Sequence, residues 1–146
     1  MEKSIYQKLA DARKAIKETE VKKAGTNSYS KYDYFTPEQV EHLVADASEK
    51  TKTLCITNLR ADEFGYYQEL QFVDLEKPDN FLTFQMRTDV PEIKATNRTQ
   101  QLGGMDTYSE RYIKMKVFQI KDNNLDFDSQ DNRKKEGENK FDDLDL

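Results

Sequence analysis

The stretch TQQLGGMDTYSERYIKMKVF, residues 99–118, has the apolar spacing of an amphipathic helix. When it is placed on a helix of about 100° per residue, most of its apolar side chains gather on one face. That face consists of Met105, Tyr108, Tyr112 and Met115, widened by Leu102, Ile113 and Val117. We therefore expect a long helix that covers a core, with Tyr108 and Tyr112 packed inside it.

A second stripe of the same helix raises a question of function, because it begins at two adjacent glycines, which weaken helices. The stripe consists of Gly103, Thr107, Arg111 and Lys114. In one interpretation, the glycines allow the helix to pack tightly on a sheet, and the two cations are solvated. In the other, bare backbone, a hydroxyl and two cations form an edge that a nucleic-acid backbone can approach closely. The spacing alone leaves both interpretations open.

The segments before this helix predict two more helices and a sheet. Residues 4–20 have helical apolar spacing, and Thr36, Pro37 and Gln39 are typical of the capped start of a helix. Three strand-like runs, joined by short turn-rich links, then follow at 53–59, 65–75 and 81–87. Their alternation of apolar and polar residues favours an antiparallel meander with one face in water.

The predicted fold class is therefore α+β. It comprises an N-terminal helix, a capped helix, and a three-stranded antiparallel meander covered by the long helix. These elements form one domain over residues 1–120. Residues 121–146 are polar, acidic and without periodicity, which predicts a disordered tail.

The charge is unevenly distributed along the chain. The net charge of −5 is unusual for a nucleic-acid-binding protein, yet two segments are basic. The local net charges are +3 for residues 1–35, −6 for 36–86, +2 for 87–120 and −4 for 121–146. Because the local field governs binding, this distribution does not exclude DNA as a partner.

Several chemistries are not expected from this sequence. The single cysteine, Cys55, excludes an intramolecular disulfide and is predicted as a buried, inert thiol, and the only histidine, His42, has a surface or capping role. No P-loop, nucleophile triad or metal-ligand cluster is visible, so we expect no cofactor, no metal and no enzymatic activity. The sequence also lacks an apolar run of membrane-spanning length, which predicts a reduced cytoplasmic protein without a membrane partner.

Two blocks of the sequence resemble one family. KYDYFTPEQVEHLV (31–44) and TNRTQQLGGMDTYSERYIKMKVFQIKDNNLDFD (96–128) are similar to the Erf (essential recombination function) family of phage single-strand annealing proteins. The residues that carry the resemblance are Tyr32 and Tyr34; Gln100, Gln101, Gly103 and Gly104; Thr107, Tyr108, Arg111 and Tyr112; and Asp122, Asp126 and Asp128. The likeness extends over roughly residues 5–128, although the strands between the blocks match only in pattern.

The resemblance implies a β-β-β-α core, assembly into rings or helical filaments, and annealing of complementary single-stranded DNA without ATP. Such a protein needs cations for the phosphates and tyrosines on which bases stack transiently. The candidate DNA-binding residues are Lys22, Lys23, Tyr29, Lys31, Tyr32, Arg98, Thr107, Arg111 and Lys114. For each of them, a plain surface role remains an alternative.

Two other functions stay open at this point. A single-strand DNA-protecting protein could use the tip FDDLDL, residues 141–146, to recruit host or phage recombination proteins. A protein adaptor or inhibitor could keep the same fold without binding DNA, which the acidic balance favours. The first would slow strand pairing, and the second would not bind DNA at all.

Overall fold

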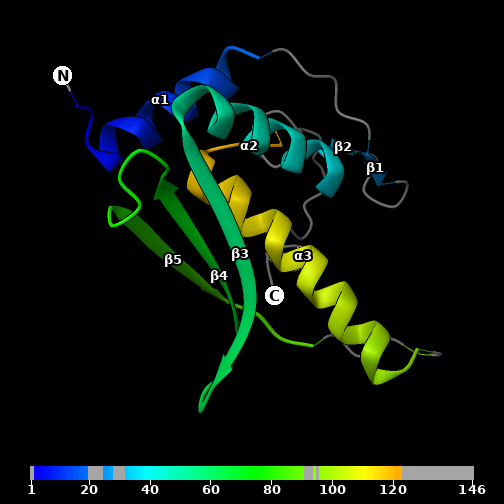
Figure 1. Cartoon of the computed structure of the whole chain (residues 1–146). Coiled ribbons are helices and arrows are strands. Elements are labelled where there is room, and N and C mark those ends of the chain that lie inside the picture. The colour runs from blue at the N-terminus through cyan, green and yellow to red at the C-terminus, as the bar shows by residue number, and fades with distance from the viewer. Residues whose placement is uncertain (1, 20–24, 28–31, 91–93, 95, 123–146) are drawn as a thin grey trace, which may run out of the picture.

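The computed structural model describes residues 2–19, 25–27, 32–90, 94 and 96–122, and it has the predicted α+β fold (Figure 1). Its elements in chain order are α1 (Ile5–Lys17), β1 (Gly25–Asn27), β2 (Tyr32–Tyr34), α2 (Pro37–Thr51), β3 (Thr53–Asp62), β4 (Gly65–Asp74), β5 (Phe81–Arg87) and α3 (Arg98–Phe118). The short antiparallel pair β1–β2 was not expected from the sequence.

The larger sheet is the predicted meander, with strand order β3-β4-β5 and both pairs antiparallel. Strand β3 continues to Asp62, through residues predicted as a turn. The chain reverses instead at Glu63–Phe64, where the Asp62 carboxylate accepts a hydrogen bond from the Phe64 amide at 2.9 Å. Gly65 follows with φ +124°, a backbone conformation that favours glycine. The hairpin is therefore longer and tighter than the sequence pattern indicated.

The helix starts follow from side-chain caps. The predicted capping box of α2 is present. The Gln39 backbone amide donates to the Thr36 hydroxyl at 3.2 Å, and the Gln39 side-chain oxygen accepts from the Thr36 backbone amide at 3.1 Å. Helix α3 starts in the same way, with Asn97 and Gln100 as the reciprocal pair. Each box satisfies backbone donors that a helix leaves unpaired at its first turn.

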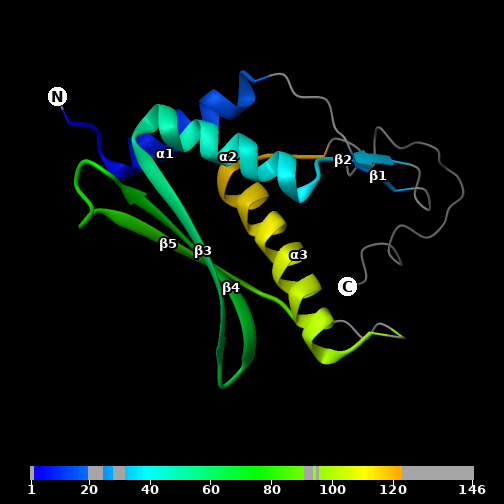
Figure 2. The same cartoon turned by 45° about the vertical axis from the view of Figure 1, so that its right-hand side comes forward.

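The core lies between the sheet and the three helices. Leu70 and Phe72 of β4 are fully buried, and the Phe72 ring meets Phe118 of α3 edge-on at a centroid distance of 5.7 Å. Helices α1 and α2 contribute further buried residues to the same cluster. Figures 1 and 2 show all three helices on one side of β3–β5, with no drawn helix over the other face. The predicted sheet with one wet face is confirmed.

The described fold reaches two residues beyond the predicted domain boundary. Asp122 has only 3% of its surface exposed and is hydrogen-bonded into the body of the protein. The predicted disordered tail therefore begins too early at residue 121. Its remaining residues, 123–146, lie outside the described part of the chain.

Candidate nucleic-acid interface

Arg111 of α3 joins three separate segments of the chain. Its Nε donates to the Phe35 carbonyl at 2.6 Å, and its Nη2 donates to the Asp122 carboxylate at 2.7 Å. Its guanidinium also lies over the rings of Tyr34 and Tyr112, at 5.2 and 4.9 Å from their centroids. Asp122 in turn accepts from the Phe35 amide at 2.9 Å. The end of β2, the helix and the segment after it are thereby fixed together.

Both interpretations of the stripe place Arg111 at the surface, and this expectation is wrong. Only 7% of its surface is exposed, because Asp122 and the Phe35 carbonyl draw its guanidinium into the protein. Phe35 is 76 residues away in sequence, so the helical wheel could not indicate this contact. The geometry gives Arg111 a structural role, so its removal should destabilise the fold.

Lys114 is also buried, with 8% of its surface exposed. Its Nζ donates to Glu110 at 2.9 Å, and the same carboxylate oxygen accepts from the Thr57 hydroxyl of β3 at 2.8 Å. Burial opposes the ionisation of Glu110, but these hydrogen bonds outweigh it and lower its pKa. The charge of Lys114 is therefore neutralised within a link between α3 and the sheet.

The predicted stripe on α3 does lead into a groove between α2 and α3. This groove has a volume of about 390 Å³. It is lined by Thr36, Pro37, Glu38, Glu41, Thr107, Glu110, Arg111 and Lys114. Three of the nine candidate residues therefore meet here, but three carboxylates share the groove with them.

The glycines lie in the other half of α3 and are exposed. A Cβ added at Gly103 or Gly104 would meet no atom within 4 Å beyond the neighbouring backbone of the helix itself, so tight packing on the sheet does not explain them. Beside them, Thr107 is exposed. Tyr108 is 60% exposed, with its ring 4.6 Å from that of Tyr112, and its predicted core position is wrong. This half of the helix presents bare backbone, a hydroxyl and an aromatic ring to solvent.

The remaining candidate residues are only partly placed. Arg98 is the first residue of α3, is exposed, and forms no ion pair with a described acid. Tyr32 lies in β2, but its side chain is not among the described groups. The other four, Lys22, Lys23, Tyr29 and Lys31, lie outside the described residues.

Five exposed cations that the sequence did not single out have no ion-pair partner among the described acids. They are Lys14, Lys17, Lys94, Lys116 and Lys121. The Arg13 Nε donates to the Val117 carbonyl at 2.8 Å, which holds the C-terminal part of α1 against the end of α3. Sequence reasoning missed these lysines because only the three-dimensional structure shows which cations are already paired.

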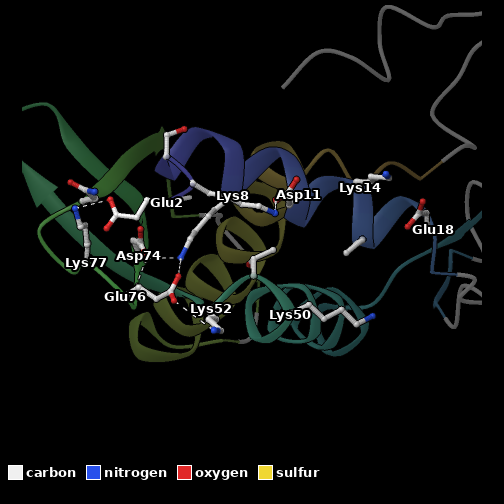
Figure 3. Close-up of a pocket in the computed structure, with 15 residues that line it drawn as sticks. Glu2, Lys8, Asp11, Lys14, Glu18, Lys50, Lys52, Asp74, Glu76 and Lys77 are labelled. Carbon is white, nitrogen blue, oxygen red and sulfur yellow. Dashed lines mark hydrogen bonds and ion pairs between the residues drawn. The ribbon is translucent and has the colours of Figure 1, made fainter.

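A second polar cleft, of about 990 Å³, lies beside α1, the end of α2 and the β4–β5 connection (Figure 3). At its base the buried Lys8 donates to Asp74 at 2.7 Å and to Glu76 at 2.8 Å. Burial disfavours the charge of Lys8, yet these bonds raise its pKa, and the bond from Lys8 lowers the pKa of Asp74. Lys77 is also paired, with Glu2 at 2.9 Å, so the cleft offers only a weak positive electrostatic field to a phosphate.

The described residues also bear on the expected inert thiol, metal ligands and membrane spans. Burial raises the pKa of the Cys55 thiol to about 11, which keeps it protonated and unreactive at neutral pH. No group of three or more His, Cys, Asp or Glu side chains in this part of the chain is placed to hold a metal ion. None of its helices is both long and apolar enough to cross a membrane.

In comparisons with known proteins, no family model matches the chain, and no curated protein or solved structure matches it either. The Erf-like resemblance therefore remains a prediction that depends on the motif residues themselves.

Proposed function

We propose that this protein binds single-stranded DNA and anneals complementary strands without ATP, as the Erf-like resemblance implies. One observation carries the proposal. Tyr34 from the first motif block, Arg111 and Tyr112 from the second, and Asp122 from the acidic end all meet in one cluster. Residues that serve a common fold are expected to meet in this way, whereas a chance match of sequence letters gives no reason for it.

In this proposal, the exposed half of α3 contacts the DNA. Arg98 neutralises a phosphate, Thr107 donates to the backbone, and the exposed ring of Tyr108 stacks on a base. Stacking on one ring leaves the pairing edge of a base available to a complementary strand. The basic segment that precedes β2, with Lys22, Lys23, Tyr29 and Lys31, supplies further contacts, as does Tyr32 of β2.

Assembly is part of the proposal. The exposed part of α3 between Arg98 and Tyr108 spans only about 16 Å at 1.5 Å per residue, which is too short to hold a stable nucleus of duplex. Several copies along one strand would provide the missing length. We therefore infer a homo-oligomer that forms on DNA or before it.

Fluorescence anisotropy with a labelled single-stranded oligonucleotide, repeated over a range of salt concentrations, tests the binding. Each phosphate contact should contribute about −0.7 to the slope of log affinity against log salt. We expect tight binding at low salt and a slope that corresponds to several contacts. No binding at low salt, or a slope near zero, would contradict a mode led by phosphate contacts.

One observation favours a second candidate, a protein adaptor or inhibitor that does not bind DNA. Both cations of the α2–α3 groove are paired with acids, and Glu38 and Glu41 add negative charge to its lining. The same titration separates the two candidates. A protecting single-strand binder would bind in that titration but would slow the pairing of complementary strands.

A further inference from the structure

Exposed apolar side chains gather at one end of the uncovered sheet face. Seven large hydrophobic residues are exposed in the described part of the chain, and four of them lie there. These four are Leu54 (46% exposed), Ile56 (37%), Leu75 (53%) and Phe81 (50%). Apolar surface that gathers in one patch, rather than scattering singly, is typical of an interaction site.

The strand register makes this patch continuous. Leu54 of β3 lies opposite Val73 of β4, and Val73 lies opposite Phe81 of β5, so one apolar row crosses all three strands. The Leu75 amide donates to the Lys52 carbonyl at 3.0 Å, which extends the sheet by one residue and places Leu75 beside the row. Side chains alternate between the faces of a sheet, so the four strand residues point away from the helices, and Leu75 is exposed next to them. We refer to Leu54, Ile56, Val73, Leu75 and Phe81 as the outer patch.

The charges on this face argue against a nucleic acid as its occupant. Arg87 forms a two-pronged ion pair with Asp62, with N–O distances of 2.6 and 2.7 Å, and it lowers the pKa of Asp62 to about 2. Arg60 pairs with Glu69 at 2.9 Å. The two arginines of the face are therefore already neutralised, and they would add little to the affinity for a nucleic acid.

A second copy of this chain fits the same face. An apolar row can meet its own copy about a two-fold axis, and the neutral ion pairs cause no repulsion between identical surfaces. Strand β4 has ten residues, so the face measures about 34 Å by about 15 Å, and two copies would bury roughly 1,000 Å² in total. That area is at the lower limit for a specific interface and indicates a reversible dimer.

We propose that two copies of the protein associate face to face through the outer patch. The contact is isologous, and it therefore differs from the head-to-tail contact that a ring or filament requires. It leaves the exposed half of α3 accessible, because the helices cover the opposite face of the sheet (Figure 2). The contact does not depend on DNA, so it can hold even if the proposed function fails.

Sedimentation velocity of the full chain without DNA, over a wide range of protein concentrations, tests the proposal. We expect a monomer–dimer equilibrium in the unmodified protein. Phe81→Glu and Leu54→Glu should each weaken it by about tenfold or more, since a buried unpaired carboxylate is costly. Tyr6→Glu, at a 70% exposed position on α1 outside the outer patch, is the matched control and should leave the dimer unchanged.

A monomer at every concentration would overturn the proposal, as would an oligomer that both patch variants leave intact. Equal weakening by Tyr6→Glu would also overturn it, because the effect would then come from added charge alone. Thermal unfolding of each variant should match the unmodified protein, since the substituted side chains are half exposed. Oligonucleotide binding is measured separately, so that a failure of the proposed function is not mistaken for a failure of this contact.

Discussion

The two halves of α3 differ in their surroundings. From Ser109 to Phe118 the helix is enclosed by the sheet, α1, α2 and the segment around Phe35, and seven of its eight buried residues lie in this half. From Arg98 to Tyr108, Met105 is the single buried residue, and both glycines are open to solvent. Residues that look alike on a helical wheel therefore have different roles in the two halves.

Within this one motif, the residues that stabilise the fold and the residues that can contact a ligand therefore lie in different halves of α3. Arg111 and Lys114 interact with buried or partly buried acids, so a ligand would have to displace those acids to reach them. Arg98 and Thr107 lie only a few turns away and are exposed. Substitutions in the enclosed half should therefore affect folding, whereas substitutions in the exposed half should affect binding.

The largest expected effect is that of Arg111→Ala. It leaves the Asp122 carboxylate buried without its cation, which should lower the free energy of unfolding by about 3–5 kcal/mol. Urea unfolding measures this, with Arg98→Ala as the matched control, expected to change stability by no more than about 0.5 kcal/mol. If both variants unfolded at the same urea concentration, the difference between the two halves would not exist.

Tyr108→Ala should affect DNA binding rather than stability. Its ring is 60% exposed, so the free energy of unfolding should change little. Losing one stacked base should weaken DNA binding by roughly 1–3 kcal/mol, which in the middle of that range is a loss of affinity of tenfold or more. Anisotropy titrations of this variant and the unmodified protein at one salt concentration provide the comparison. An unchanged affinity would remove Tyr108 from the interface.

A smaller effect on stability is expected at the glycines, opposite in sign to that of Arg111→Ala. Gly103→Ala should stabilise the protein by roughly 0.8–1 kcal/mol, because alanine favours the helix and the new Cβ meets no atom within 4 Å beyond the neighbouring helix backbone. If DNA approaches the bare backbone there, the same variant, and more strongly Gly103→Leu, should bind it less well. Thermal unfolding and a titration are run on the same samples. A loss of stability would restore the packing interpretation.

The smallest effect is expected for deletion of residues 129–146. The sequence after residue 120 has a net charge of −4, and an acidic segment tethered near basic residues competes with DNA for them. The deletion should raise the affinity for single-stranded DNA at low salt. This gain in affinity should shrink as the Debye length falls to about 8 Å near physiological salt. Equal affinities at low salt would leave partner docking as the better explanation of the tip at 141–146.

The three helices and the three-stranded sheet were predictable because their signals are local. Alternation along β4 and β5 and the capping residues around Thr36 each depend on a few neighbouring residues. The burial of Arg111 depends on Phe35 and Asp122, which a helical wheel cannot include. The prediction for Tyr108 failed for the same reason, since a helical wheel cannot show that Met105 is the single residue buried in the early half of α3.

The most direct test of the account is the rate at which two complementary oligonucleotides pair, followed by energy transfer between end labels without ATP. The unmodified protein should accelerate pairing, and an Arg98→Ala, Tyr108→Ala double variant of normal stability should lose most of that acceleration. Pairing that the unmodified protein leaves unchanged or slows, or full activity in the double variant, would contradict annealing by the exposed half of α3.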